Sequence, residues 1–114
     1  MANSFKSETD KEIGTSTATV FTCASSTETT IIGLSVANRV SSQILIDVEL
    51  DASSRTSGAE DKVFLIKDAP IPVGGSLVVV GGDQKLVMEP GDTIKVTSDT
   101  ASSADVVVSH LDIT

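Results

Sequence analysis

The clearest pattern in the chain is a strict alternation of side chains from residue 44 to residue 51. The apolar set is Ile44, Ile46, Val48 and Leu50, and the opposite set is Leu45, Asp47, Glu49 and Asp51. A period of two residues is that of a β-strand with one buried face. We therefore expect the first set to lie in a hydrophobic core and the second set to face mainly solvent.

Other short segments rich in Val, Ile and Thr, which favour strands over helices, recur about every 8–12 residues. They are residues 17–22, 30–37, 62–67, 76–80, 85–88, 93–98 and 105–113. The clearest turn signal between them is Glu89-Pro90-Gly91-Asp92, in which Pro90 presets one turn position and Gly91 accepts a positive φ at the next. The pattern predicts an all-β fold: a single-domain antiparallel β-sandwich of about eight short strands, with jelly-roll or immunoglobulin-like connections.

Two local features refine this pattern. Pro70 and Pro72 cannot donate to a sheet ladder, so residues 68–75 are expected to be an extended crossing between the two sheets rather than a central strand. In the last segment, the expected inner face carries Val107, Leu111 and Ile113. That assignment places His110 on the opposite face, directed outward or toward a neighbour.

The first fourteen residues differ from the rest because they are polar and carry charges of both signs. Between Asn3 and Gly14, only Phe5 and Ile13 are large apolar residues. We expect residues 1–14 to form an extended N-terminal arm outside a β-sandwich domain of residues 15–114. In this interpretation Phe5 and Ile13 anchor the arm on a neighbouring subunit, and a frayed terminus is the alternative.

Charge and aromatic content exclude several kinds of partner. The formal net charge is −8, which opposes binding to a phosphate backbone and suits basic proteins or cations. Three Phe and no Trp or Tyr leave few aromatic platforms for stacking on bases or sugars. No apolar run approaches the roughly 20 residues that span a membrane, and the start lacks the apolar core of a secretory signal. We expect a soluble protein with no nucleic-acid or membrane partner.

Candidate chemistry is sparse. Cys23 and His110 are single residues of their kinds, so neither an intrachain disulfide nor a zinc site is expected from them. The acidic positions Asp47, Glu49 and Asp51 allow a solvated face, a contact for a basic partner, or a cation site completed by Asp83 or Asp92. The glycine pairs at 74–75 and 81–82 match no phosphate-loop pattern. We expect no enzyme activity and no cofactor or metal.

The second half of the chain resembles a known group of proteins. The motifs are Lys67-Asp68-Ala69-Pro70-Ile71-Pro72 after a strand, Gly74-Gly75-Ser76-Leu77 at a hairpin, and Pro90-Gly91-Asp92 at a turn. Together with residues 30–38 they resemble small β-sandwich virion proteins of tailed bacteriophages, including those of marine cyanobacterial phages. The resemblance covers roughly residues 17–112 and rests on turn and core positions, which specify a fold more than an activity.

The resemblance implies a structural component of a phage particle, assembled in the host cytoplasm. Head decoration, neck or collar, and tail or fibre attachment all fit such a domain. Its expected partners are other copies of itself, as a homo-oligomer, and other virion proteins. The residues expected at its interfaces are Phe5, Ile13, Leu45, Asp47, Glu49 and Asp51. The alternative is a small module at a fibre tip that binds a host surface or a glycan, and a hydrolase is a weaker third hypothesis.

Overall fold

The computed structural model of the chain describes residues 3–53, 55 and 62–114, and these form nine β-strands. The strands are β1 (Asn3–Ile13), β2 (Ala18–Thr22), β3 (Glu28–Asn38), β4 (Ile44–Asp51), β5 (Lys62–Ile71), β6 (Ser76–Val80), β7 (Leu86–Met88), β8 (Thr93–Ser98) and β9 (Ala104–Ile113). Within this described part, no helix is long and apolar enough to cross a membrane.

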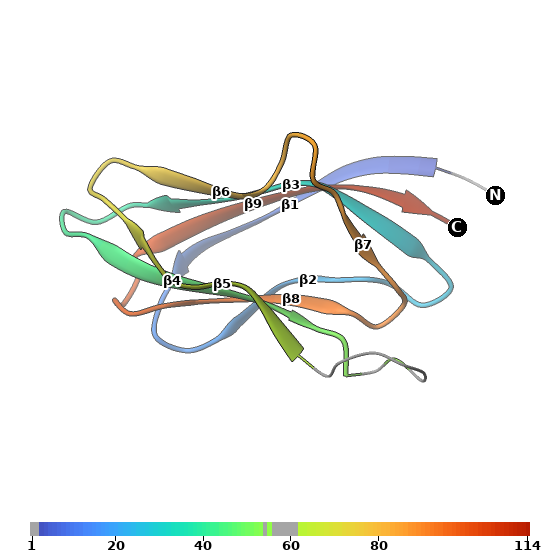
Figure 1. Cartoon of the computed structure of the whole chain (residues 1–114), viewed down its shortest axis with the longest axis horizontal. Helices are drawn as coiled ribbons and strands as arrows, with labels where there is room; N and C mark the ends of the chain where they lie inside the picture. The colour runs from blue at the N-terminus through green and yellow to red at the C-terminus, as the bar shows by residue number, and fades with distance from the viewer. Residues whose placement is uncertain (1–2, 54, 56–61) are drawn as a thin grey trace.

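The strands form two antiparallel sheets that face each other, as Figure 1 shows from the side. Sheet A has the order β1-β9-β3-β6, and β7 also pairs with β3; sheet B has the order β2-β8-β4-β5. β6 pairs with residues 34–37 of β3 and β7 with residues 29–31, so the two short strands occupy one strand position in two parts. Counted this way, the order is that of a jelly roll, one of the two expected connections of the β-sandwich.

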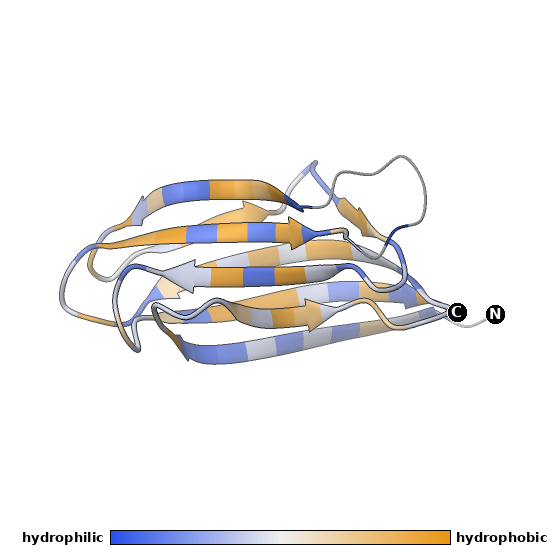
Figure 2. Ribbon diagram, turned by 90° about the horizontal axis from the view of Figure 1, so that it is seen from below, coloured by the Kyte–Doolittle hydropathy of each residue, from blue (hydrophilic) through white to orange (hydrophobic). Residues whose placement is uncertain are grey.

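The core lies between the sheets and is built from the inward residues of both. Its fully buried large side chains include Ile31, Leu34, Val36, Ile44, Ile46, Val48, Ile71, Met88, Ile94, Val96 and Val106. The apolar and polar bands that alternate along the strands in Figure 2 show the same period of two. Burying each aliphatic side chain contributes roughly 1.5–3 kcal/mol, so this layer is the main stabilising element of the fold.

The expected strands from residue 17 onward are confirmed to within a few residues. The expected crossing of residues 68–75 is shorter than predicted, because residues 68–71 belong to β5. β5 continues through Pro70 to Ile71 at the edge of sheet B, where a missing backbone donor is tolerated. Residues 72–75 then lead to β6 in sheet A. Gly91 has a φ of 90° in the expected turn, and Asp92 N donates to Glu89 O at 3.0 Å.

The expected N-terminal arm is a strand of the sandwich, and this part of the sequence interpretation is wrong for residues 3–13. β1 pairs antiparallel with β9, from Asn3 opposite Ile113 to Asp10 opposite Val106. Ile13 is buried in the core of its own chain, so it cannot anchor on a neighbour. The strand escaped sequence analysis because both faces of most of this edge strand lie in solvent, which removes the period-two signal. Residues 1–2 lie outside the described residues.

The inner face of β9 is also the opposite of the expected one. Val106, Val108 and His110 point into the sandwich, whereas Val107 is exposed and Leu111 and Ile113 are half-buried. The run Val106-Val107-Val108 is apolar at every position and therefore carries no information on which face is buried. His110 therefore occupies a core position, whereas the alternation predicts that it points outward or toward a neighbour.

A pair of substitutions tests the place of β1 in the fold. We expect Ile13→Ala to lower the free energy of unfolding by about 2–4 kcal/mol, because it opens a cavity in the core. Phe5 is 76% exposed, and Phe5→Ala should change it by less than about 0.5 kcal/mol. Urea denaturation measures both. Equal, small effects would contradict the strand assignment and return residues 3–13 to the status of an arm.

Candidate functional site

The outer face of sheet A is uncharged over most of its area, and we refer to it as the neutral face. Its side chains are Phe5, Ser7 and Thr9 of β1, Val107, Ser109 and Leu111 of β9, Thr30, Gly33 and Ser35 of β3, Val78 of β6 and Val87 of β7. They lie in rows across the strands. One row is Phe5, Leu111, Thr30 and Val87, and another is Thr9, Val107, Ser35 and Val78.

Large apolar side chains are exposed on this face. Phe5 is 76% exposed, Val78 66%, Val87 63% and Val107 44%. Charged strand residues lie beyond the ends of the rows: Glu28 next to Ile113 at one end, and Asp105 with Lys11 and Glu12 of β1 at the other. A neutral, partly apolar sheet face is unusual in a chain with a net charge of −8 and marks a surface suited to contact with another protein.

The outer face of sheet B carries the acidic residues that were expected at an interface. Asp47 Oδ2 lies 3.2 Å from Lys67 Nζ, and its other oxygen accepts from Asp68 N at 2.8 Å. Asp51 is buried and lies 2.9 Å from Lys95 Nζ. These two carboxylates therefore have cationic partners within the chain, which reduces what they can offer to a basic protein.

Leu45 and Glu49 are half-buried on the same face of sheet B. Leu45 lies opposite Pro70 of β5 and its backbone N–H donates to Asp99 Oδ1 at 3.0 Å. Glu49 lies between Lys95 of β8 and Phe64 of β5 in the sheet. Of the six expected interface residues, Phe5 alone lies on the neutral face, Ile13 belongs to the core, and Leu45, Asp47, Glu49 and Asp51 lie on the opposite side of the sandwich.

The Asp51–Lys95 pair shifts the protonation of both groups. The Ser53 hydroxyl, followed by the Lys95 ammonium, lowers the pKa of Asp51 well below its ordinary value of 3.8. The hydrogen bond to Asp51 raises the pKa of Lys95 above 10.5. Both groups are thus held in their charged forms at neutral pH, as expected for a stabilising pair rather than a proton-transfer site.

The pH dependence of stability tests this pair. A depressed carboxyl pKa stabilises the folded state above the ordinary value of 3.8, and this stabilisation is lost as the pH falls through the folded-state pKa. We expect Asp51→Asn to unfold at lower urea concentration than the wild type at pH 7, and the difference to shrink in acid below pH 3.8. Ser53→Ala should act in the same direction. A difference that stays constant with pH would contradict the assignment.

His110 is almost fully buried between β1, β2 and β9. Its Nε2 lies 3.1 Å from Glu8 Oε2 of β1, and its Nδ1 lies 2.8 Å from Asp112 Oδ1 of its own strand. The Thr29 hydroxyl donates to the same Asp112 oxygen at 2.9 Å, and the Phe21 ring lies 4.4 Å from the imidazole, centroid to centroid. Three strands of sheet A and one strand of sheet B therefore meet at this ring.

The arrangement around His110 fits a structural tie better than a catalytic triad. In a triad, one ring nitrogen must be free to accept the proton of a nucleophile. Here a carboxylate oxygen lies within hydrogen-bond distance of each ring nitrogen, so neither nitrogen is free for a nucleophile. Asp47 lies on the far sheet and is no part of this cluster. His110 joins β1 to the body of the sandwich.

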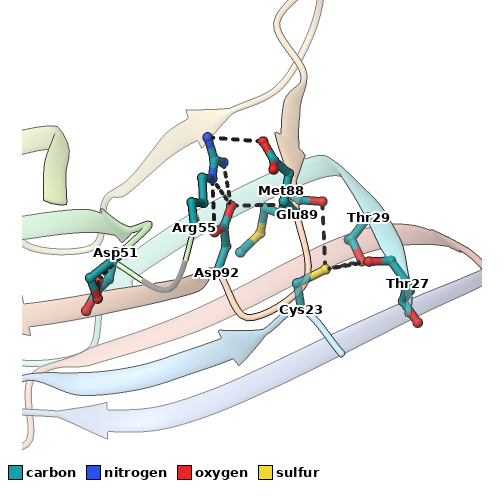
Figure 3. A network of polar contacts seen from close by, with 9 residues as sticks. Cys23, Thr27, Thr29, Asp51, Arg55, Met88, Glu89 and Asp92 are labelled. Atoms are coloured by element: carbon teal, nitrogen blue, oxygen red, sulfur yellow. Dashed lines mark hydrogen bonds and ion pairs between the residues drawn. The ribbon is translucent and has the colours of Figure 1, made fainter. Parts of the chain in front are cut away.

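A second buried polar cluster lies where the loop after β4 meets the β7–β8 turn (Figure 3). Asp92 has no exposed surface; Arg55 Nε lies 3.1 Å from its carboxylate, and a terminal guanidinium nitrogen of Arg55 binds it as well. The Glu89 backbone N–H donates to Asp92 at 3.0 Å, and the Glu89 side chain approaches Arg55 at 3.4 Å. The carboxylate raises the pKa of Arg55, so the guanidinium stays charged.

Cys23 lies next to this cluster, just after β2. Its Sγ contacts Thr27 O at 3.3 Å and Thr29 Oγ1 at 3.4 Å, as Figure 3 shows. Burial raises the pKa of the thiol, which keeps it protonated and unreactive. In Figure 3 Asp51 lies apart from Asp92, and within the described residues no group of three or more His, Cys, Asp or Glu side chains could hold a metal ion.

Two arginine–aspartate pairs allow a matched test of the Arg55 cluster. Removing Arg55 leaves the Asp92 carboxylate buried without its cation, so we expect Arg55→Ala to lower the free energy of unfolding by about 3 kcal/mol. The Arg39–Asp105 pair, at 3.1 Å, is exposed on both sides, and Arg39→Ala should cost less than about 1 kcal/mol. Urea denaturation at pH 7 compares them, and equal losses would rule out a special role for the buried pair.

Two open hollows flank β1. One, of about 270 Å³, is lined by Glu8 and residues 19–22, and the other, of about 420 Å³, is lined by residues 9–11 and 105–107. Comparisons of the chain with protein-family models, curated proteins and solved structures give no match. The surface features of the sandwich are therefore the basis for a functional conclusion, and the neutral face is the most distinctive of them.

Proposed function

We propose that this protein is a structural component of a phage particle and that it docks on another virion protein through the neutral face. The observation that carries the proposal is the exposure of Phe5, Val78, Val87 and Val107 on one uncharged sheet face of an otherwise acidic chain. The resemblance of residues 17–112 to tailed-phage virion proteins supports the particle as its location.

The fold is compatible with a structural role in a virion but does not distinguish this role from others. Jelly rolls occur in viral capsid proteins, lectins and cupins, so a function must be argued from a site rather than from the topology. The neutral face supplies that argument because the core of a protein–protein interface is depleted in charged residues and enriched in apolar contact area. Its rows of small and apolar side chains form the broad surface that another flat protein face would cover.

The distribution of charge favours one side of the sandwich for contact. Glu28 and Asp105 mark the ends of the neutral face, and on sheet B the carboxylates of Asp47 and Asp51 are paired with Lys67 and Lys95. A partner with a neutral face meets no uncompensated charge at the centre of sheet A, whereas on sheet B it would have to desolvate ion pairs. The expected contact through the acidic residues of β4 is thus less favourable than contact through β1, β3, β6, β7 and β9.

Charge insertion on the neutral face tests the proposal. We expect the wild-type chain to co-sediment with purified phage particles and the double variant Val78→Lys with Val87→Lys to lose at least about tenfold in particle-bound protein. The lysines would sit at exposed positions, so thermal unfolding should be nearly unchanged. Val73→Lys is the matched control, because Val73 is similarly exposed but lies in the β5–β6 connection.

The outcomes separate the two parts of the proposal. Absence of the wild-type chain from purified particles would overturn the virion role. Particle binding by the double variant at the wild-type level would overturn the neutral face as the docking surface. Loss of binding in the Val73→Lys control to the same extent would show that added charge, rather than its position, weakens the association, and would also count against the neutral face.

A further inference from the structure

One edge of sheet A is formed by β1, which is eleven residues long, whereas the other edge is divided between the short strands β6 and β7. β9 covers one side of β1, and in the strand order of the described residues no strand lies on the other side. An exposed edge of this length presents backbone N–H and C=O groups that can pair with a further strand. The bulge between Asp10 and Ile13 bends the end of the strand and leaves the segment before it as the regular part.

The side chains of β1 have a self-complementary order. Lys6 and Glu8 flank Ser7, and because they are two residues apart they project from the same face of the sheet. We infer that two copies of the protein pair antiparallel through their β1 edges, about a two-fold axis that passes between Ser7 of one copy and Ser7 of the other. In this register Lys6 of each copy lies opposite Glu8 of the second copy.

The register is selected by charge. If the axis moved by one residue, either two lysines at position 6 or two glutamates at position 8 would lie directly opposite, and like charges in that position destabilise a sheet. With the axis at Ser7, the other pairs are Phe5 opposite Thr9 and Ser4 opposite Asp10, with no like charges. All of these residues precede the bulge.

Lys6 and Glu8 are both exposed at the β1 edge of a single copy. The Glu8 side chain is about half exposed, and its Oε2 lies 3.1 Å from His110 Nε2. Lys6 lies opposite His110 in the ladder and forms no ion pair with any residue that the structure describes. Because His110 ties Glu8 to the core, the carboxylate is held in place before a second copy arrives, which reduces the entropy lost on association.

The pairing of two β1 edges is argued independently of the proposed function. Its use on a phage particle rests on that proposed function. A two-fold axis perpendicular to the sheet keeps the faces of the two copies on the same side. The two neutral faces would then form one continuous surface, with both Phe5 side chains near its centre. Two linked docking surfaces bind a repeating particle lattice much more tightly than one. Opposite charges on β1 would also hinder pairing with unrelated strands, a second benefit of the same residues.

Disulfide cross-linking tests the register directly. At the axis, Ser7 and its counterpart would be about 4.5–5.5 Å apart between Cα atoms, within the range of a disulfide. We expect Ser7→Cys to form a disulfide-linked dimer under mild oxidation. Thr9→Cys is the matched control, because residues 9 of the two copies would lie about four residues apart along the strands, beyond disulfide reach. Cys23 is buried and should not contribute to cross-linking.

A charge variant tests the same contact without cross-linking. We expect the wild-type chain to be dimeric in sedimentation equilibrium at micromolar concentration. Lys6→Glu should weaken the dimer by at least about tenfold, because it places two carboxylates opposite each other on both sides of the axis. Lys11→Glu is the matched control, since Lys11 lies in the bulge of the same strand, where this register would place it opposite the uncharged Asn3.

These experiments distinguish the inference from the proposed function. Equal cross-linking of Ser7→Cys and Thr9→Cys, or a wild-type chain that stays monomeric, would overturn the edge pairing. Particle binding that is unaffected by Lys6→Glu would overturn its proposed use on the particle while leaving the neutral face in place. A specific dimer that never associates with particles would support the pairing and overturn the virion role.

Discussion

The structure depends on one constraint: each strand of a two-layer sandwich can bury only one of its two faces. Ile44, Ile46 and Val48 of β4 and Val106 and Val108 of β9 belong to the same buried core, and the alternate residues of these strands must then face outward. Most inward residues are aliphatic side chains whose burial stabilises the fold, with His110 as a polar exception. The outward residues do not have to fit into the core, and the two outer faces differ in charge and polarity.

The two outer faces of the sandwich differ in how they carry charge. On sheet B the carboxylates are retained and paired with lysines, as in Asp47–Lys67 and Asp51–Lys95. On sheet A the central rows contain no charge, and side chains such as Phe5 and Val78 remain exposed. An ion-paired face is well solvated and has little to gain from contact, whereas an uncharged face with apolar side chains gains free energy when it is covered.

Buried polar groups connect the edges of the sandwich to its body. His110 joins the edge strand β1 to β9 through Glu8 and packs on Phe21 of the other sheet. Arg55 joins the loop after β4 to the β7–β8 turn through Asp92. These polar contacts stabilise the fold less than the apolar core does. Removing one partner of such a contact still lowers the stability strongly, because the remaining charge is left without a partner. They attach the long edge strand β1 and the Arg55 side chain to the body of the sandwich.

The amino-acid sequence by itself determined the class of fold, most of the strand bounds, the alternation of β4 and the proline crossing after β5, because these depend on local periodicity and backbone geometry. Only the tertiary structure decided the role of residues 3–13, the inward side of β9, the jelly-roll order, the place of His110 and the assembly of the neutral face. The edge strand β1 lies in solvent on both faces over most of its length, so its sequence does not alternate between apolar and polar residues. The three consecutive valines of β9 do not indicate which of its faces is buried. A face made of residues from five strands exists only after the ladder registers bring them together, and no short stretch of sequence encodes those registers.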